Sequence, residues 1–299
     1  MPPGWGLTDT GRMTTFRLGP WNELAEGVFV LVAQPANVNI GLVVGERACL
    51  LVDTGSTPEQ GRLIRARVAE VTDRPLTHVV VTHAHWDHLY GLAAFDDVET
   101  LGHESIAASL AQAPDATSRQ CADLGISPDD LVAPNRPFGV MRAIDLGGRV
   151  AQIVHVGPAH TTGDAIVIVD RVVFTGDLVE QGADPSIEPA GTLASWPLAL
   201  ECVLKSAAKG SLFVPGHGDP VDERFVQRQR SDLLWIVGEV SDNVRNGITL
   251  ASALASLGTD TAPDWPFNEA TMRDVLPVAY GQLAREGHTP RRQLPITSV

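Results

Sequence analysis

Short apolar runs rich in β-branched residues recur along most of the chain, and each run stops at a polar or glycine-rich turn. Runs of four to eight residues with this composition are typical of half-buried or fully buried strands. We therefore expect strands over residues 28–32, 40–44, 48–52, 78–81, 98–102, 141–144, 150–156, 165–169, 172–174 and 211–214.

Helical spacing of apolar residues separates several of these strands. Within residues 57–71, the apolar positions Leu63, Ile64, Val68 and Val71 recur every three or four residues, which predicts an amphipathic helix with these side chains on one face. Shorter helices are expected over residues 89–95, 103–111 and 195–205.

Two long polar stretches interrupt the alternation of strands and helices. Residues 112–139 are rich in Pro, Asp, Ser and Asn, and we expect a polar insertion there with a single helical turn. Residues 178–194 carry glycine, proline and acidic residues and are expected to form a loop. Long loops in compact domains often act as lids or binding loops, so both stretches are candidates for contacting a substrate.

The apolar period changes from two to 3.6 residues after Asp222, which predicts a helical C-terminal region. The first helix should end at Gly247, and Thr249 and Asn268 are suited to cap two further helices. Pro277 lies inside the last of these helices and should kink it.

These patterns predict an α/β (α+β) protein in three parts. They are a mobile N-terminal segment at residues 1–20, a domain of strands and helices at residues 21–222, and a helical extension at residues 223–299 that packs on this domain.

Composition excludes several classes of protein. The chain has 299 residues, of which 44% are hydrophobic and 19% charged, too apolar for a disordered chain. Its net charge of −14 disfavours binding to nucleic acid or to an anionic membrane. The three cysteines, Cys49, Cys121 and Cys202, form no CxxC pair. A disulfide framework or thiolate cluster is therefore not expected, and, with no secretory signal visible, we expect a cytoplasmic protein.

The strongest chemical signal is the run Thr82-His83-Ala84-His85-Trp86-Asp87-His88, which follows a predicted strand. Side chains of an extended segment alternate, so His83 and His85 project to one side and can bind one borderline metal ion such as Zn²⁺. Asp87 and His88 lie at the turn into a helix and can face a second metal ion.

Four further predicted strands end in a residue of the same kind, most of them beside glycine. These residues are Asp53, His160, Asp177 and His217. Each is weak evidence by itself, because a lone Asp or His at a strand end is usually a turn or capping residue. Together with the histidine run, they predict one cluster of metal ligands.

The ordered set Asp53, His83-x-His85-x-Asp87-His88, His160, Asp177 and His217 resembles the metallo-β-lactamase superfamily. The resemblance covers about residues 25–222. It implies an αββα four-layer sandwich with a two-metal site at one edge of the sheets, followed here by the helical extension.

The resemblance also implies a role for each residue. His83, His85 and His160 would hold the first metal ion, and Asp87, His88 and His217 the second. Asp177 would bridge the two ions, and Asp53 would orient a ligand imidazole. The ions are expected to be zinc, with iron or manganese as alternatives.

Within the superfamily, an aspartate at position 177 resembles the glyoxalase II, lactonase and ribonuclease branches, and residues 37–44 resemble general bacterial metallo-hydrolases. The resemblance implies a hydrolase in which a hydroxide held by two divalent metal ions attacks a small acyl substrate, an ester, thioester or lactone. Asp87 is the candidate for acid–base work. Partners other than the small-molecule substrate are not expected, and the oligomeric state is left open.

Three alternative functions remain open from the sequence. One is a single-iron sulfur dioxygenase with the same motifs, and the metal identity would distinguish it. Another is a phosphodiesterase or nuclease, which the negative charge disfavours. The last is a non-catalytic binding module, which would be expected to lack some of the ligands that are all present here.

Overall fold

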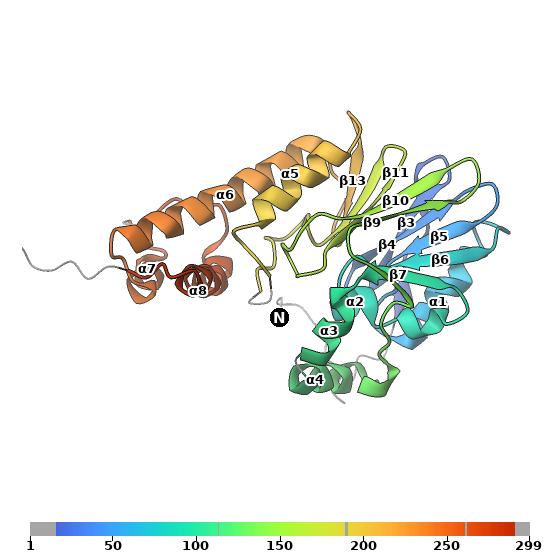
Figure 1. Cartoon of the computed structure of the whole chain (residues 1–299), viewed down its shortest axis with the longest axis horizontal. Helices are drawn as coiled ribbons and strands as arrows, with labels where there is room; N and C mark the ends of the chain where they lie inside the picture. Colours follow the sequence, from blue (N-terminus) through green and yellow to red (C-terminus); the bar gives the residue numbers. More distant parts are fainter. Residues whose placement is uncertain (1–15, 113, 189–190, 261, 291–299) are drawn as a thin grey trace, which may run out of the picture.

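The chain folds into two β-sheets packed face to face, with helices on both outer faces (Figure 1). The description rests on a computed structural model, which describes residues 16–112, 114–188, 191–260 and 262–290. This arrangement is the four-layer αββα sandwich that the sequence predicts.

The first sheet has eight strands in the order β1-β3-β4-β5-β6-β7-β8, with β2 also paired to β3. Strands β3 to β5 pair antiparallel, and β5 to β8 pair parallel. Their bounds are β1 Arg17–Leu18, β2 Asn22–Ala25, β3 Val28–Gln34, β4 Val38–Val44, β5 Cys49–Val52, β6 Leu76–Val80, β7 Glu99–His103 and β8 Arg136–Phe138.

The second sheet has five strands in the order β13-β12-β11-β10-β9. All neighbours pair antiparallel except β12 and β13, which pair parallel. The bounds are β9 Met141–Asp145, β10 Val150–His155, β11 Ala165–Val169, β12 Val172–Gly176 and β13 Leu212–Pro215.

Adjacent residues of the central strands face different apolar cores. Leu50 and Val80 lie between the two sheets, whereas Leu51 and Val79 face the helices outside the first sheet. Successive side chains of a strand point to opposite faces, so a strand covered on both sides must be apolar throughout. This burial explains why these runs are continuous in apolar residues rather than alternating.

Helices on the outer face of the first sheet cover one of these cores. Thr57 caps the first of them by accepting a hydrogen bond from the backbone N–H of Gln60. Their bounds are α1 Pro58–Val68, α2 Trp86–Leu89, α3 Ser105–Gln112 and α4 Pro114–Leu124, with short 3₁₀ turns at Leu92–Phe95 and Pro128–Asp130.

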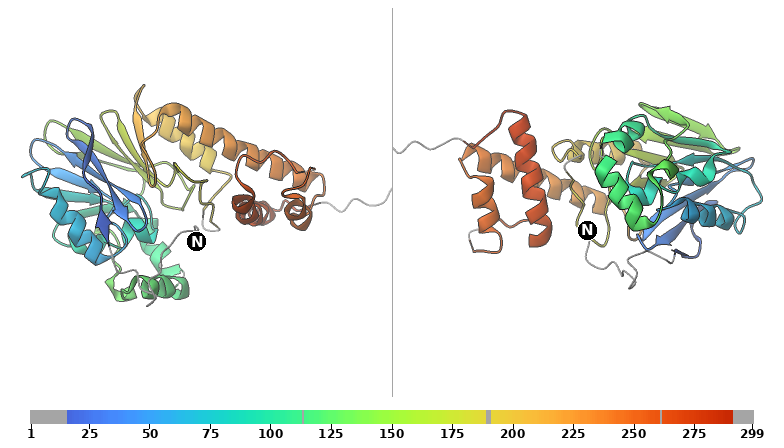
Figure 2. Two further views of the ribbon diagram at one scale, coloured as in Figure 1. Left: turned by 180° about the vertical axis from the view of Figure 1, so that it is seen from behind. Right: turned by 90° about the horizontal axis from the view of Figure 1, so that it is seen from below.

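The second sheet is covered by α5 (Trp196–Ser206) and by the C-terminal helices α6 (Glu223–Arg245), α7 (Leu250–Ser256) and α8 (Glu269–Arg285). The side chains of Asp222, Thr249 and Asn268 cap α6, α7 and α8, as the sequence predicts for the last two. Figure 2 shows α6 running outward from the sheets, with α7 and α8 beside its far end. No helix in the described part of the chain is long and apolar enough to cross a membrane.

The structure corrects the sequence-based expectation after residue 112, in α1, and at residues 89–95, where α2 ends at Leu89 and a 3₁₀ turn follows at Leu92–Phe95. Residues 112–139 do not form a polar insertion with one turn, because α4 has 11 residues and β8 joins the first sheet. Only Cys121 and Leu124 of α4 are buried, so the helix is mostly polar and its apolar residues do not show a recognisable helical spacing. In α1, Leu63 does not lie on the buried face as expected, because its side chain is 43% exposed. Gln60 and Gly61 are buried beside Ile64 instead.

The three-part division of the chain stays a prediction. Within the segment predicted to be mobile, Arg17 and Leu18 pair with β3, and residues 1–15 lie outside the described residues. The kink predicted at Pro277 also stays a prediction, although this residue does lie inside α8.

A pair of Gly→Ala substitutions tests the packing of the two sheets. A Cβ at Gly41 would overlap the ring of Phe174 in the opposite sheet, whereas a Cβ at Gly238 in α6 meets nothing within 4 Å. Gly41→Ala should lower the free energy of unfolding by about 1–3 kcal/mol. Gly238→Ala should raise it by up to about 1 kcal/mol. Denaturant unfolding measures both, and a neutral Gly41→Ala would contradict this packing.

Candidate metal centre

The ends of several strands bring the candidate ligands to one edge of the sandwich. In the first sheet, Asp53 follows β5 and His83 follows β6 after a short link. In the second sheet, Asp177 follows β12 and His217 follows β13, while His160 lies in the turn after β10. Both pairs of neighbouring strands, β5 with β6 and β12 with β13, run parallel, so their carboxyl ends meet at the same edge.

The run from His83 to His88 turns from extended chain into a helix. His85 is the N-cap residue of α2, and Asp87 and His88 lie in its first turn. This change of conformation separates the four side chains into two directions. Asp87 and His88 therefore face a different point in space from His83 and His85, as the sequence predicts.

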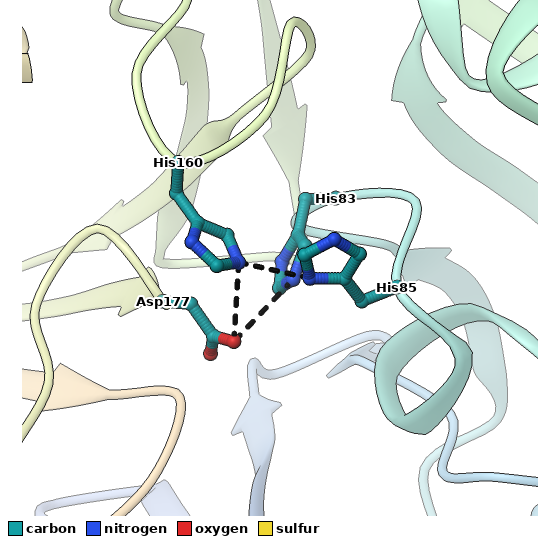
Figure 3. Close-up of side chains that lie close together, drawn as sticks. All are labelled: His83, His85, His160 and Asp177. Atoms are coloured by element: carbon teal, nitrogen blue, oxygen red, sulfur yellow. Dashed lines mark hydrogen bonds and ion pairs between the residues drawn. The ribbon is translucent and has the colours of Figure 1, made fainter. Parts of the chain in front are cut away.

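His83, His85, His160 and Asp177 form the first group of ligand atoms, all within 4.8 Å of one another. Figure 3 shows the three imidazoles and the carboxylate converging on one point. His160 Nε2 lies 2.9 Å from His85 Nδ1 and 3.4 Å from Asp177 Oδ2. His83 Nε2 lies 3.5 Å from the same carboxylate oxygen.

Asp87, His88 and His217 form the second group, within the same 4.8 Å limit. His217 Nε2 lies 3.2 Å from Asp87 Oδ2, and His88 Nε2 lies 3.8 Å from that oxygen. The structure therefore brings together all seven residues that the sequence predicts as ligands.

Asp177 lies between the two groups. Its Oδ2 faces His83 and His160, whereas its Oδ1 lies 3.2 Å from His88 Nε2 and 3.6 Å from His217 Nε2. The carboxylate has room because position 216 is glycine, and a Cβ there would overlap Asp177 Oδ1. This geometry is suited to a carboxylate that bridges two cations.

The chemistry of the donor set fits metal ions. Within the described residues, His83 Nε2, His88 Nε2 and Asp177 Oδ1 are buried and have no hydrogen-bond partner. A buried polar atom without a partner costs free energy, and a cation coordinated at this point would remove that cost. Imidazole nitrogens and carboxylate oxygens are the usual ligands of zinc, iron and manganese.

Each candidate ligand imidazole has a partner for the ring nitrogen that points away from the centre. Four of these partners are within hydrogen-bond distance: Asp53 Oδ2 for His88 (2.8 Å), Thr82 Oγ1 for His83 (3.0 Å), the Ser186 carbonyl for His160 (3.1 Å) and the Ala36 carbonyl for His217 (3.2 Å). The fifth is Glu188, whose Oε2 lies 3.5 Å from His85 Nε2. Such contacts fix the orientation of a ligand ring.

Only Asp53 was predicted for this orienting role. It has a left-handed backbone, with φ 65°, and also accepts hydrogen bonds from the backbone N–H and the hydroxyl of Thr82. Thr82 directly precedes His83, and its hydroxyl group is the signal in the sequence that could have indicated this role. Ala36 and Ser186 act through backbone carbonyls, so their side chains give no signal in the sequence.

The histidines of the centre differ in their electrostatic surroundings, and within the first group Glu188 raises the pKa of His85 against the effect of burial. Burial, together with neighbouring His88, lowers the pKa of His83 to about 3. Burial also lowers the pKa of His160 well below its usual value. At His217, burial is outweighed by Asp177 and Asp87, which raise the pKa to about 9.

Asp164 holds the turn that carries His160. Its carboxylate accepts hydrogen bonds from the backbone N–H groups of Ala159 and Thr161, the residues on either side of His160. It also accepts one from the Thr161 hydroxyl. Burial nevertheless raises the pKa of Asp164 to about 7.

The acidic residues Glu180, Asp184 and Glu188 of the loop 178–194 lie in three different environments. Asp184 accepts hydrogen bonds from Asn268 and Thr271 at the start of α8. Glu180 lies on the inner side, where burial and then Asp177 raise its pKa well above its usual value. Glu188 is half exposed beside His85, and its contact with that ring lowers its pKa.

Other residues noted in the sequence lie outside the ligand set. Tyr90 is buried, and its hydroxyl donates to Gln120. His103 and His155 stack on each other with ring centres 3.9 Å apart. Trp196, which the motifs did not indicate, packs its ring against His160 with the centres 5.5 Å apart.

Comparison with known proteins agrees with this site. The family model described as the metallo-beta-lactamase superfamily matches residues 33–218, which include the whole donor set. The chain belongs to the metallo-β-lactamase superfamily. Three solved structures with 14% to 20% sequence identity share this fold, and their matches cover at least 73% of this chain. One is a metallo-beta-lactamase from Pontibacter korlensis, whose match has a TM-score of 0.58 and covers 74% of this chain and 99% of that protein. At this identity they show the fold alone.

Relatives within the superfamily differ in activity. A linear primary-alkylsulfatase of a Pseudomonas species is 22% identical over 70% of this chain, and the match spans 47% of that protein, less than half its length. The acyl-coenzyme A thioesterase MBLAC2 of Homo sapiens is 27% identical over 60% of this chain and 72% of its own. The metallo-beta-lactamase type 2 of Bacillus cereus is 24% identical over 76% and 84%.

Removing the partner of His88 tests the orienting contacts. Asp53→Ala should weaken zinc binding by about 10–100-fold, because the His88 ring is then free to turn. Competition with a chromophoric chelator measures the affinity. Asp170→Ala is the matched control, since Asp170 also has a positive φ, of 52°, but lies in the turn between β11 and β12. Equal losses in both variants would contradict the role of Asp53.

The raised pKa of Asp164 leads us to expect a specific pH dependence of the free energy of unfolding. Its pKa in the folded protein, about 7, lies above the ordinary aspartate value of 3.8, so the folded state holds this proton more tightly. Its contribution to stability is present below about pH 4 and is lost as the pH rises through about 7. In metal-free samples, the free energy of unfolding of the wild type should fall over this range relative to Asp164→Asn. A difference that does not change with pH would contradict the raised pKa.

Proposed function

We propose that the chain is a metal-dependent hydrolase of small acyl compounds, an ester, thioester or lactone, and that it works with two divalent cations. The observation that supports two cations is the position of Asp177, whose two oxygens face separate groups of imidazoles. Membership of the superfamily supports hydrolysis as the reaction class.

Zinc is the metal we propose, because imidazoles make up five of the seven donors, with iron or manganese as alternatives. His83, His85 and His160 would hold one cation, and Asp87, His88 and His217 the other, with Asp177 shared. When bound, the cations would supply Lewis acidity and would lower the pKa of water enough for a hydroxide to be available near neutral pH.

The protein's own residues would position the reactants and move the proton. Hydrolysis adds water to the acyl carbon, breaks its bond to oxygen or sulfur, and leaves an acid and an alcohol or thiol. Burial would raise the pKa of Asp87, but the neighbouring His88 and His217 lower it to about 2, so it is ionised near neutral pH. Its carboxylate, in the second group, is the proposed acceptor of the proton that water loses.

The relatives order the candidate substrates. Among acyl compounds, thioesters come first, because an acyl-coenzyme A thioesterase is one of the relatives. Hydrolysis of a sulfate ester is the second candidate, supported by the alkylsulfatase relative.

Metal analysis and a reporter screen test this proposal. The purified, metal-replete protein should contain close to two metal ions per chain by elemental analysis. It should hydrolyse small thioester, ester or lactone reporters much faster than phosphodiesters. One equivalent of iron with oxygen consumption on a persulfide substrate would contradict the proposal and favour a sulfur dioxygenase. Faster turnover of an alkyl sulfate than of every acyl reporter would favour the second candidate.

Truncating one ligand should separate activity from folding. His83→Ala should lower kcat by at least about 100-fold, because a cation would lose one of its four proposed donors. Its far-ultraviolet circular dichroism should match that of the wild type, since His83 lies beyond the end of β6. His288→Ala, at an exposed position after α8, is the matched control and should keep full activity. Loss of folded structure in His83→Ala would contradict this separation.

A further inference from the structure

The ligands of the metal centre differ in exposure, which shows where it opens to solvent. The side chains of His85 and His217 are 25% and 21% exposed, whereas those of His83, His88 and His160 are at most 1% exposed. A substrate must therefore approach past His85 and His217.

Glu188 lies at this opening. Its Oε2 is 3.5 Å from His85 Nε2, on the side of the ring opposite to the nitrogen that faces His160. Half of the Glu188 side chain is exposed, so its carboxylate borders both the ligand ring and the solvent.

The backbone around Glu188 is fixed at several points. Asp184, four residues earlier, is bound to Asn268 and Thr271 at the start of α8. The Ser186 carbonyl accepts a hydrogen bond from His160 Nδ1, and the Gly191 carbonyl accepts one from the side-chain amide of Gln282 in α8. The carboxylate is thereby held at the opening rather than carried on a free loop.

Its charge is not balanced by a cationic side chain. Among the residues that the structure describes, no lysine or arginine forms an ion pair with Glu188, Asp87 or Asp177. Two divalent cations would be half neutralised by the two ligand carboxylates, and a nucleophilic hydroxide would neutralise them further. A fixed negative charge at the opening then acts on the part of the substrate that stays outside the centre.

We propose that Glu188 is a specificity-determining residue, which favours acyl substrates with a neutral or cationic leaving group over those with an anionic one. This inference rests on the proposed function. It predicts that thioesters with phosphate or sulfonate groups near the acyl carbon, and alkyl sulfates, are poor substrates of this chain.

Glu188 could instead serve only to orient His85, and two substitutions distinguish these roles. Glu188→Gln keeps an oxygen that accepts a hydrogen bond from His85 Nε2 but removes the charge. Glu188→Ala removes both. A residue that only orients the ring would lose metal affinity in Glu188→Ala and show no change in charge preference in Glu188→Gln.

Three butyryl thioesters that differ in the charge of the leaving thiol provide the test. The leaving groups are thiocholine (cationic), N-acetylcysteamine (neutral) and mercaptoethanesulfonate (anionic), and one thiol reagent detects all three products. Kinetics are measured on metal-replete protein at low and high salt, with the metal content of each variant determined. Calorimetric titration with thiocholine and with mercaptoethanesulfonate gives a binding preference that does not depend on turnover.

We expect the wild type to favour the cationic over the anionic thioester in kcat/KM. Glu188→Gln should reduce this preference by about 2- to 5-fold, mainly through KM, and keep its metal content. High salt should reduce the preference of the wild type in the same direction. Glu46→Gln, an equal change of charge in the exposed turn between β4 and β5, should leave it unchanged.

An unchanged preference in Glu188→Gln with full metal content would overturn the inference, as would equal effects of Glu188→Gln and Glu46→Gln. A wild type that hydrolyses none of the three thioesters contradicts thioester hydrolysis itself. The calorimetric preference and its loss in Glu188→Gln then decide separately whether Glu188 selects by charge.

Discussion

A buried carboxylate at the meeting point of two imidazole groups is the constraint on which the rest of this site depends. Asp177 is 7% exposed, and an ionised carboxylate in such surroundings needs positive charge or hydrogen-bond donors around it. His83, His88 and His160 converge on it for this reason, and their outer nitrogens need acceptors in turn. Glycines at 176 and 216 leave room, since a Cβ at Gly176 would lie 2.8 Å from the Thr82 hydroxyl.

Much of this site could be predicted from the sequence because the ligands follow strands that are easily recognised. The strand before Asp177 is buried at every residue, and the strand before His83 ends in the buried pair Val79 and Val80, so each can be recognised by its apolar residues. The helix α4 could not be predicted in the same way. Cys121 and Leu124 are its only buried residues, so its sequence shows little helical apolar spacing.

The contacts around the ligands were the least predictable part. A carbonyl such as that of Ala36 or Ser186 is present at every residue, so only the fold decides which one meets an imidazole. The acidic residues after Asp177 show the same limit. Asp184 and Glu188 look equivalent in the sequence, yet one is bound to α8 and the other borders His85.

Each donor group draws its members from both sheets. The first combines His83 and His85, which follow β6, with His160 and Asp177 from the second sheet, and the second group combines Asp87 and His88 with His217. Metal ions held there would cross-link the sheets, at an edge already joined by the bond from Asn39 to the Pro215 carbonyl. Folding and metal supply would then be linked, because a ligand that binds only the native state adds about 2.7 kcal/mol at a concentration 100 times its Kd. Scarcity of metal would open the sandwich first at the edge where its chemistry takes place.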